Sequence, residues 1–143
     1  MTAGALCTFR VGANRYGVPV ERVVEVVTAA DVTPVPLAPA SVLGLLNLRG
    51  EILMAVSLRR VFGLDDAEGD GERTHLVVRH GEEALTLVVD AAEDVFDAGE
   101  APLEPCPASV PQHLRGRVRG VALLERELLL ALDLDRLLAE ALP

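Results

Sequence analysis

The chain has 143 residues, half of them hydrophobic, and a formal net charge of −9. This charge argues against a nucleic-acid partner, because neutralising phosphates requires clustered Lys and Arg, whereas the 13 basic residues are scattered. No apolar run approaches the ~20 residues that span a bilayer, and residues 1–5 lack the pattern of a signal peptide. We therefore expect a cytoplasmic protein without direct membrane insertion.

Short strands closed by turns fill the start of the chain. Residues 6–11 alternate as a strand, and Tyr16, Val18 and Val20 share one face of a second strand. Pro19 places this second strand at an edge or on a bend, since proline cannot donate a ladder hydrogen bond. Residues 23–27 continue as apolar, β-branched chain, and prolines make residues 31–39 an extended connector.

A hairpin and a short helix follow. Strands are predicted at 42–48 and 52–56, around a turn at 49–51. Ser57 then stands at the N-cap of a helix over 58–62, and Gly63 at its end. The acidic, glycine-rich residues 65–72 are predicted to form a loop.

The second half repeats this plan. Strands are predicted at 76–78 and 85–89, a proline-rich connector at 97–111 and a hairpin of 120–124 with 128–132. Asp133 is predicted to cap a C-terminal helix over 134–142.

The repetition can be followed residue by residue. Adding 69 to positions in the first strands, or 76 to positions in the hairpin and helix, reaches similar residues: Gly12 and Gly81, Tyr16 and Leu85, Val18 and Leu87, Gly44 and Gly120, Ile52 and Leu128, Leu58 and Leu134. We predict an all-β chain of two small barrels with short helices, because barrels remove sheet edges. The approximate halves are 6–63 and 74–142, and they should share a core because each is marginal alone.

No catalytic or metal-binding pattern is found. Cys7 and Cys106 stand alone without a CxxC spacing, and the histidines have no Cys or carboxylate partner at ligand spacing. The loop from Asp66 resembles a calcium loop in part, but Val77 stands where a bidentate Glu is required. No phosphate loop or GxSxG elbow occurs. We expect no enzyme activity, metal or cofactor.

The segment 44–50, Gly-Leu-Leu-Asn-Leu-Arg-Gly, is the candidate for recognition. Asn47 and Arg49 share a strand face next to a hairpin tip. Arg49 offers a fork of donors to a partner carboxylate or carbonyl, but an Arg bracing its own barrel fits the spacing equally. Glu25 reads first as a solvated strand edge, while Val23 and Val26 fit either a core or an exposed apolar patch.

At this hairpin the sequence resembles the CheW family of chemotaxis coupling proteins. The matching segments cover the chain from about Leu6 to Leu138, and their order and spacing make the match specific: Thr8-Phe9-Arg10-Val11-Gly12, Tyr16-Gly17-Val18, Val23-Val24-Glu25-Val26, Gly44 to Leu53, Val56-Ser57-Leu58-Arg59, Leu87-Val88-Val89-Asp90 and Leu132-Asp133-Leu134. Met54 stands where the family usually has Pro, and Ser57 where Asp is usual.

The resemblance implies one CheW-like domain over 1–143, built as two intertwined SH3-like five-stranded barrels, with strands exchanged between them as an open option. It implies a non-enzymatic adaptor between the cytoplasmic tip of a chemoreceptor (a methyl-accepting chemotaxis protein) and the regulatory domain of a CheA-like histidine kinase. On this resemblance Gly44, Asn47, Arg49, Val89 and Asp90 bind the receptor or support that surface, and Val23, Glu25 and Val26 bind the kinase.

Two alternatives follow from the same resemblance. Leu43 and Ala92 depart from the family pattern near the proposed surfaces. The chain could therefore be a CheW-like variant that binds only receptors. It could also be a regulatory barrel domain related to the kinase's own.

Overall fold

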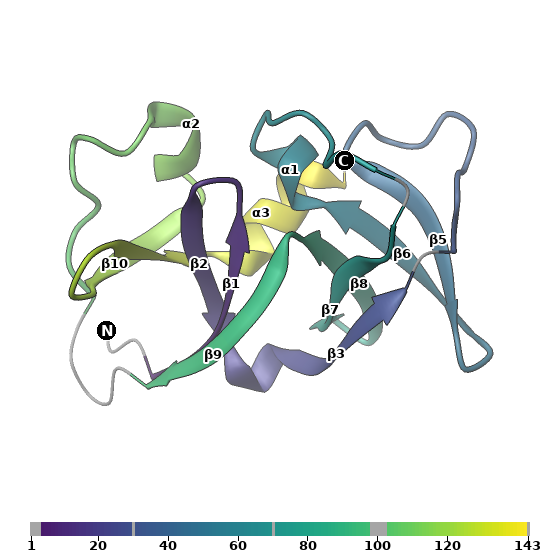
Figure 1. Cartoon of the computed structure of the whole chain (residues 1–143), viewed down its shortest axis with the longest axis horizontal. Helices are drawn as coiled ribbons and strands as arrows, with labels where there is room; N and C mark the ends of the chain where they lie inside the picture. The colour runs from purple at the N-terminus through teal and green to yellow at the C-terminus, as the bar shows by residue number, and fades with distance from the viewer. Residues whose placement is uncertain (1–3, 30, 70, 98–102, 143) are drawn as a thin grey trace.

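The structure is a computed structural model that describes residues 4–29, 31–69, 71–97 and 103–142. Two β-sheets stand side by side, and the helices α1 (Leu58–Val61) and α3 (Leu134–Ala141) lie where they meet (Figure 1). The first sheet has the strand order β10 (Val118–Leu123), β11 (Leu128–Leu132), β2 (Asn14–Pro19), β1 (Ala5–Val11) and β9 (Ala91–Asp97). The second has the order β3 (Val23–Ala29), β7 (Arg73–His80), β8 (Glu83–Val89), β6 (Glu51–Ser57), β5 (Val42–Leu48) and β4 (Val32–Thr33).

The two halves of the chain exchange strands. Strand β3, from the first half, pairs with β7, whereas β9, from the second half, pairs with β1. The partners Phe9 and Ala92 become Val78 and Val23 when the repeat offset of 69 is applied, so the two exchanges share one register. The predicted all-β fold of two intertwined barrels with a C-terminal helix is confirmed, and β4 adds a sixth strand to the second sheet.

Several local predictions need correction. Val20 does not extend the second strand, because Pro19 ends it and the 3-10 helix η1 (Val20–Arg22) turns the chain toward the other sheet. The connector after residue 30 contains β4, which reaches β5 where Val32 lies opposite Leu46. The sequence does not predict β9, because this strand is exposed along most of its length and its residues therefore lack an alternating pattern. Directly after the second connector, the one-turn helix α2 (Gln112–Arg115) begins behind Pro111, and it was not predicted.

Both sheets share one hydrophobic core, as predicted. The rings of Phe9, Tyr16 and Phe62 stack through it, with centroid separations of 6.0 and 4.7 Å. The helix α3 (Leu134–Ala141) buries Leu134, Leu137 and Leu138 in the same core. These contacts join α1 and the first sheet in one packing unit, which explains how two marginal halves are stabilised together.

Side-chain caps begin two of the helices at the predicted positions. The Ser57 hydroxyl accepts a hydrogen bond from the Arg60 N–H at 3.2 Å, at the start of α1 (Leu58–Val61). The Asp133 carboxylate accepts one from the Arg136 N–H at 3.2 Å, at the start of α3. Gly63 has φ 77°, which favours glycine after α1.

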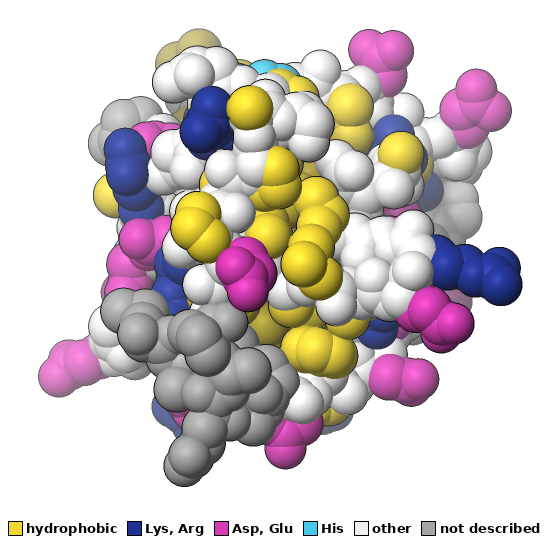
Figure 2. Space-filling view, turned by 90° about the vertical axis from the view of Figure 1, so that its left-hand side faces the viewer, with side chains coloured by type: hydrophobic (Ala, Val, Ile, Leu, Met, Phe, Trp, Pro, Cys, Tyr) yellow, Lys and Arg dark blue, Asp and Glu magenta, His cyan; other side chains and the backbone are white. Residues whose placement is uncertain are grey.

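A smaller apolar cluster fills the other face of the first sheet. Leu6, Leu129 and Ala131 are buried there, with Phe96 and Leu103 packed against them. Apolar side chains also gather as a strip on the end of the molecule that this sheet forms (Figure 2). Leu123, on the edge strand β10, is 68% exposed.

Candidate functional site

The β5–β6 hairpin forms the tip that carries Asn47 and Arg49. Arg49 and Gly50 both have positive φ, at 53° and 86°, as a tight two-residue hairpin turn requires. The Asn47 carboxamide oxygen accepts a hydrogen bond from the Gly50 N–H at 3.0 Å. Asn47 therefore fixes the turn, and the Arg49 side chain, 72% exposed, extends from it.

The Arg49 guanidinium binds Glu25 of the edge strand β3. Its Nη1 donates to Glu25 Oε2 at 2.9 Å. This hydrogen bond is the main reason that the pKa of the Glu25 carboxyl lies below its usual range. The ion pair spans from the hairpin tip to β3 beside a small hollow of about 230 Å³ that Val24, Leu48 and Leu53 help to line. Of the interpretations left open for Arg49, bracing its own barrel is therefore observed.

Strand β3 presents apolar side chains around this ion pair. Val24 and Val26 are 47% and 48% exposed. Val23 is half-buried and packs against the shared core. The three residues expected to bind the kinase thus lie on one edge strand, where Val26 and Glu25 reach solvent and Val23 anchors the strand.

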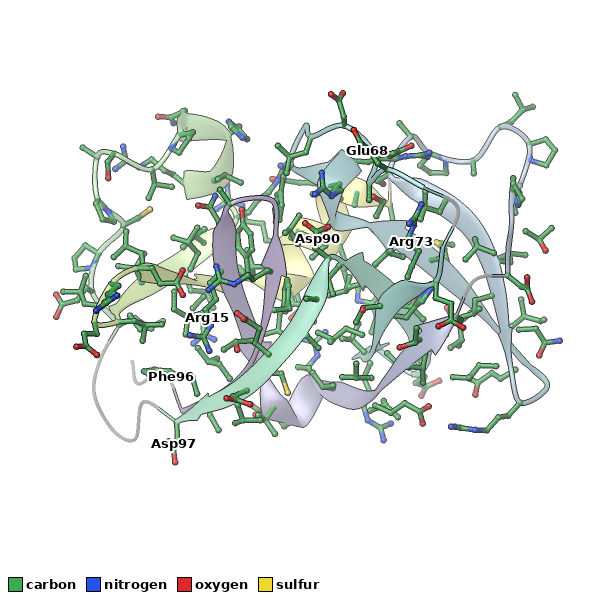
Figure 3. All side chains as sticks on the ribbon, in the orientation of Figure 1. Arg15, Glu68, Arg73, Asp90, Phe96 and Asp97 are labelled. Atoms are coloured by element: carbon green, nitrogen blue, oxygen red, sulfur yellow. The ribbon has the colours of Figure 1, made fainter. Side chains whose placement is uncertain are left out.

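A cleft of about 340 Å³ lies at the second sheet where β8 passes into β9. Asp90 stands at this crossover, and its carboxylate accepts hydrogen bonds from Arg59 Nε at 2.7 Å and Nη2 at 2.8 Å. The N–H of Gly12, from the turn between β1 and β2, donates to Asp90 Oδ2 at 2.7 Å. Asp90 therefore links α1, the β1–β2 turn and the β8–β9 crossover. In Figure 3 Asp90 and Arg73 lie beside the loop that carries Glu68.

The pKa of Asp90 reflects two opposing influences. Burial, the largest single influence, raises the pKa, but the hydrogen bonds from Arg59 and Gly12 and the positive charge of Arg59 together lower it more, so the pKa lies below its usual range. The neighbouring Val89 is only 3% exposed. The cleft thus offers a partner the charged Arg59–Asp90 pair, with Val89 supporting it from beneath.

The residues expected to bind a receptor do not form one patch. Asn47 and Arg49 lie at the hairpin tip, whereas Val89 and Asp90 line the cleft. Gly44 is buried, with β4 so close that an added Cβ would lie 2.1 Å from the Thr33 carbonyl oxygen. Its position is set by packing, so Gly44 supports the site without contacting a partner.

Sequence reasoning missed a cluster of four charged residues on the first sheet. Arg10 binds Glu127 at 2.7 Å and Glu93 at 3.1 Å, and Arg15 lies 3.3 Å from Glu93. Arg10 and Arg15 stand opposite each other on β1 and β2. Like charges opposite each other on a hairpin need acidic partners, and this was the available signal. Figure 3 shows Arg15 on the first sheet, away from Asp90.

Within the described ranges, no group of three or more His, Cys, Asp or Glu residues could hold a metal ion. In the same ranges, no helix has the length and apolar character needed to cross a membrane.

Comparison with known proteins identifies relatives over nearly the whole chain. The model of the CheW-like domain family matches residues 5–142. The chemotaxis protein CheW of Rhizobium meliloti is 32% identical over 130 residues, which cover 91% of this chain and 84% of that protein. Protein FrzA of Myxococcus xanthus is 34% identical over 116 residues, covering 78% and 72%. The crystal structure of the scaffolding protein TtCheW from Thermoanaerobacter tengcongensis superimposes with a TM-score of 0.81 at 26% identity, covering 96% of this chain and 92% of that chain.

Proposed function

This chain belongs to the CheW-like domain family, and from that premise we propose that it is a non-enzymatic scaffold coupling chemoreceptors to a CheA-like histidine kinase. Its partners would be the cytoplasmic tip of a receptor and the regulatory domain of the kinase, and it would act in the cytoplasm. The observation that carries the proposal is the match of one scaffold family to residues 5–142, combined with two separate exposed surfaces on one rigid core.

The first surface is the cleft at Asp90. It combines a charged pair, Arg59 with Asp90, with nearby apolar side chains such as Leu43. A receptor tip is a helical hairpin, which presents apolar stripes flanked by polar residues. The cleft would bind such a hairpin through burial of its apolar stripe and through hydrogen bonds to the charged pair.

The second surface is the barrel end around β3. Val24 and Val26 expose apolar area there, and the Glu25–Arg49 ion pair joins this strand to the hairpin tip. This surface would pack against the homologous barrel of the kinase. Arg49, which the resemblance assigns to the receptor, binds Glu25, which it assigns to the kinase. The two residues therefore act on the same barrel end.

Coupling would then be positional. A receptor on the cleft and a kinase on the barrel end would be held by one core, so a change in receptor position would reach the kinase without bond making or breaking. Each contact would be of the modest size typical of signalling encounters, below about 1,200 Å². Many such contacts in an array would supply persistence.

Separate binding measurements test the proposal. The purified chain is titrated with a receptor tip and, separately, with a kinase regulatory domain. Arg49→Ala should leave the fold intact because the side chain is 72% exposed, and it should weaken receptor control of the kinase. Normal receptor-controlled kinase activity in that variant would contradict the assignment of Arg49. Receptor binding without kinase binding would favour the receptor-only alternative.

A further inference from the structure

Leu37 is an anomaly among the described residues. Its side chain is 104% exposed, which is full exposure to solvent. Its φ is 63°, in the left-handed region that Gly and Asn adopt readily and that leucine rarely adopts. The folded chain therefore holds a large apolar side chain in an unfavourable backbone conformation and in water at the same time. Outliers of this kind concentrate at functional sites.

The loop around Leu37 is stiff. Pro34, Pro36 and Pro39 restrict the backbone on both sides of it. The Ala38 N–H donates to the Val35 carbonyl at 3.4 Å and closes a turn over Leu37. A side chain held out on a restrained loop loses little conformational freedom on binding, which is the property of a preorganised anchor.

This loop is attached to the elements that build the Asp90 cleft. Arg60 Nη1 donates to the Ala40 carbonyl at 3.2 Å, while its Nε and Nη2 each bind the Asp66 carboxylate at 3.0 Å. The Ser57 N–H donates to the Ser41 carbonyl at 2.8 Å. Asp66 and Ser57 both line the cleft. Figure 1 shows the loop after α1 at the top centre and the loop before β5 running from beside it to the upper right.

The same loop lies far from the barrel end. Strand β5 runs from Val42, next to the loop, to Leu48, next to Arg49. At about 3.3 Å per residue, the two ends of this strand are about 20 Å apart. Leu37 therefore lies toward the end of β5 that borders the cleft through Leu43, and not toward the Arg49 end beside β3.

We infer that Leu37 is an apolar anchor of the receptor contact, inserted as a knob between apolar side chains of the receptor's helical hairpin. This inference rests on the proposed function. A protruding leucine fits the hole that four side chains form on the surface of a helix. The acidic residues Asp65, Glu68 and Glu72 in the adjacent loop, next to the Asp66 that Arg60 neutralises, favour a hairpin that carries Lys or Arg beside that hole.

Leu37→Asn separates the effect of Leu37 on binding from its effect on folding. Asparagine tolerates the left-handed conformation and removes the apolar surface, so the thermal midpoint should rise by a few degrees while receptor-tip affinity falls about tenfold. Leu37→Gly should behave in the same way in binding. Leu37→Met keeps an apolar side chain and should bind within about twofold of the unmodified chain. Leu123→Asn makes the same chemical change at another exposed leucine, on the first sheet, and should leave the affinity unchanged.

The assay is titration of each variant with a purified receptor tip and, separately, with a kinase regulatory domain, next to melting curves. Kinase-domain affinity should be the same for Leu37→Asn and the unmodified chain. If the unmodified chain binds the tip and Leu37→Asn and Leu37→Gly bind it equally well, the anchor is wrong and the proposed function stands. Selective loss of kinase-domain binding would also overturn the inference. If the unmodified chain fails to bind the tip, the proposed function fails and the anchor with it.

Discussion

Replacing Gly44 by alanine should strongly destabilise the fold without removing any partner contact. The new Cβ would lie 2.1 Å from the Thr33 carbonyl oxygen, 2.6 Å from the Thr33 carbonyl carbon and 2.9 Å from the Pro34 Cα. All three atoms belong to the backbone, so β4 must move away from β5, and the pairing of Thr33 with Leu45 would be disturbed. Gly44 also has φ 152°, where an L side chain is strained.

The cost can be estimated from these parts. Backbone strain contributes about 1–3 kcal/mol, and each lost ladder hydrogen bond about 1 kcal/mol, so the free energy of unfolding should fall by about 3–5 kcal/mol. A domain of this size is typically stable by only about 5–15 kcal/mol. Gly44→Ala would therefore remove a large part of the stability, and the protein that remains folded should bind a receptor tip as the unmodified chain does.

Gly50→Ala is the matched control, in the turn of the same hairpin. Gly50 has φ 86° but no atom within 4 Å of an added Cβ. Its substitution should cost only about 1–2 kcal/mol. Urea unfolding followed by circular dichroism gives both values, and receptor-tip binding is measured where each variant is folded. If the free energies of unfolding of Gly44→Ala and Gly50→Ala lie within about 1 kcal/mol of each other, the crowding argument is refuted. If Gly44→Ala is folded and cannot bind the receptor tip, Gly44 contacts the partner directly.

Two further predictions follow from buried or partly buried polar groups. Asp90→Asn should lower the free energy of unfolding by about 1 kcal/mol, a value reduced for solvent screening because the side chain is 25% exposed. It should also weaken receptor-tip binding by more than this loss of stability explains. Asp135→Asn, which removes the ion-pair partner of Arg22 at 2.8 Å, is the control and should leave receptor-tip binding unchanged. His75 is fully buried, with Nδ1 3.0 Å from Thr86 Oγ1, and burial lowers its pKa below the usual value, with a smaller opposing effect from the Ala29 backbone. Its stabilising contribution is complete above about pH 6.5 and is lost as pH falls toward the folded-state pKa, by up to about 1.4 kcal/mol per pH unit. The urea midpoint of the unmodified chain should fall as the pH is lowered from about 7.5 to about 5.5, and that of the double variant His75→Leu with Thr86→Val should fall less. If the two proteins give parallel profiles of urea midpoint against pH, His75 does not titrate on unfolding.

The sequence allowed the fold to be predicted because local signals and the repeat agreed. Strand β5 was predicted with its observed ends, and Ser57 and Asp133 cap α1 and α3 as expected. The unpredicted elements share a cause. Strand β9 is an exposed edge, β4 is two residues long and α2 is a single turn, so none of them has enough buried positions to produce a periodic pattern.

The site was less predictable because it depends on contacts between distant segments. Spacing placed Arg49 on a hairpin tip, but only the exchange of β3 brings Glu25 within 2.9 Å of it. The Arg59–Asp90 pair likewise joins residues that are 31 positions apart. Leu37 carried no signal, because full exposure is decided by the neighbouring chain and not by the residue.

The repeat also separates what folding requires from what recognition adds. Gly120 is the equivalent of Gly44, and it too is crowded, by Leu103 Cβ at 2.8 Å and the Glu104 carbonyl oxygen at 2.9 Å. The bridge of Glu104 to Val121 is the equivalent of the pair Thr33 and Leu45. A feature present in both halves is explained by packing alone. The Arg49–Gly50 turn becomes Glu125–Arg126 in the second copy, and the buried pair His75 and Thr86 corresponds to Leu6 and Gly17 in the first copy. Packing that both halves share cannot account for such differences. A mutational search for coupling residues should therefore begin at the hairpin tip and in the core beside the second sheet.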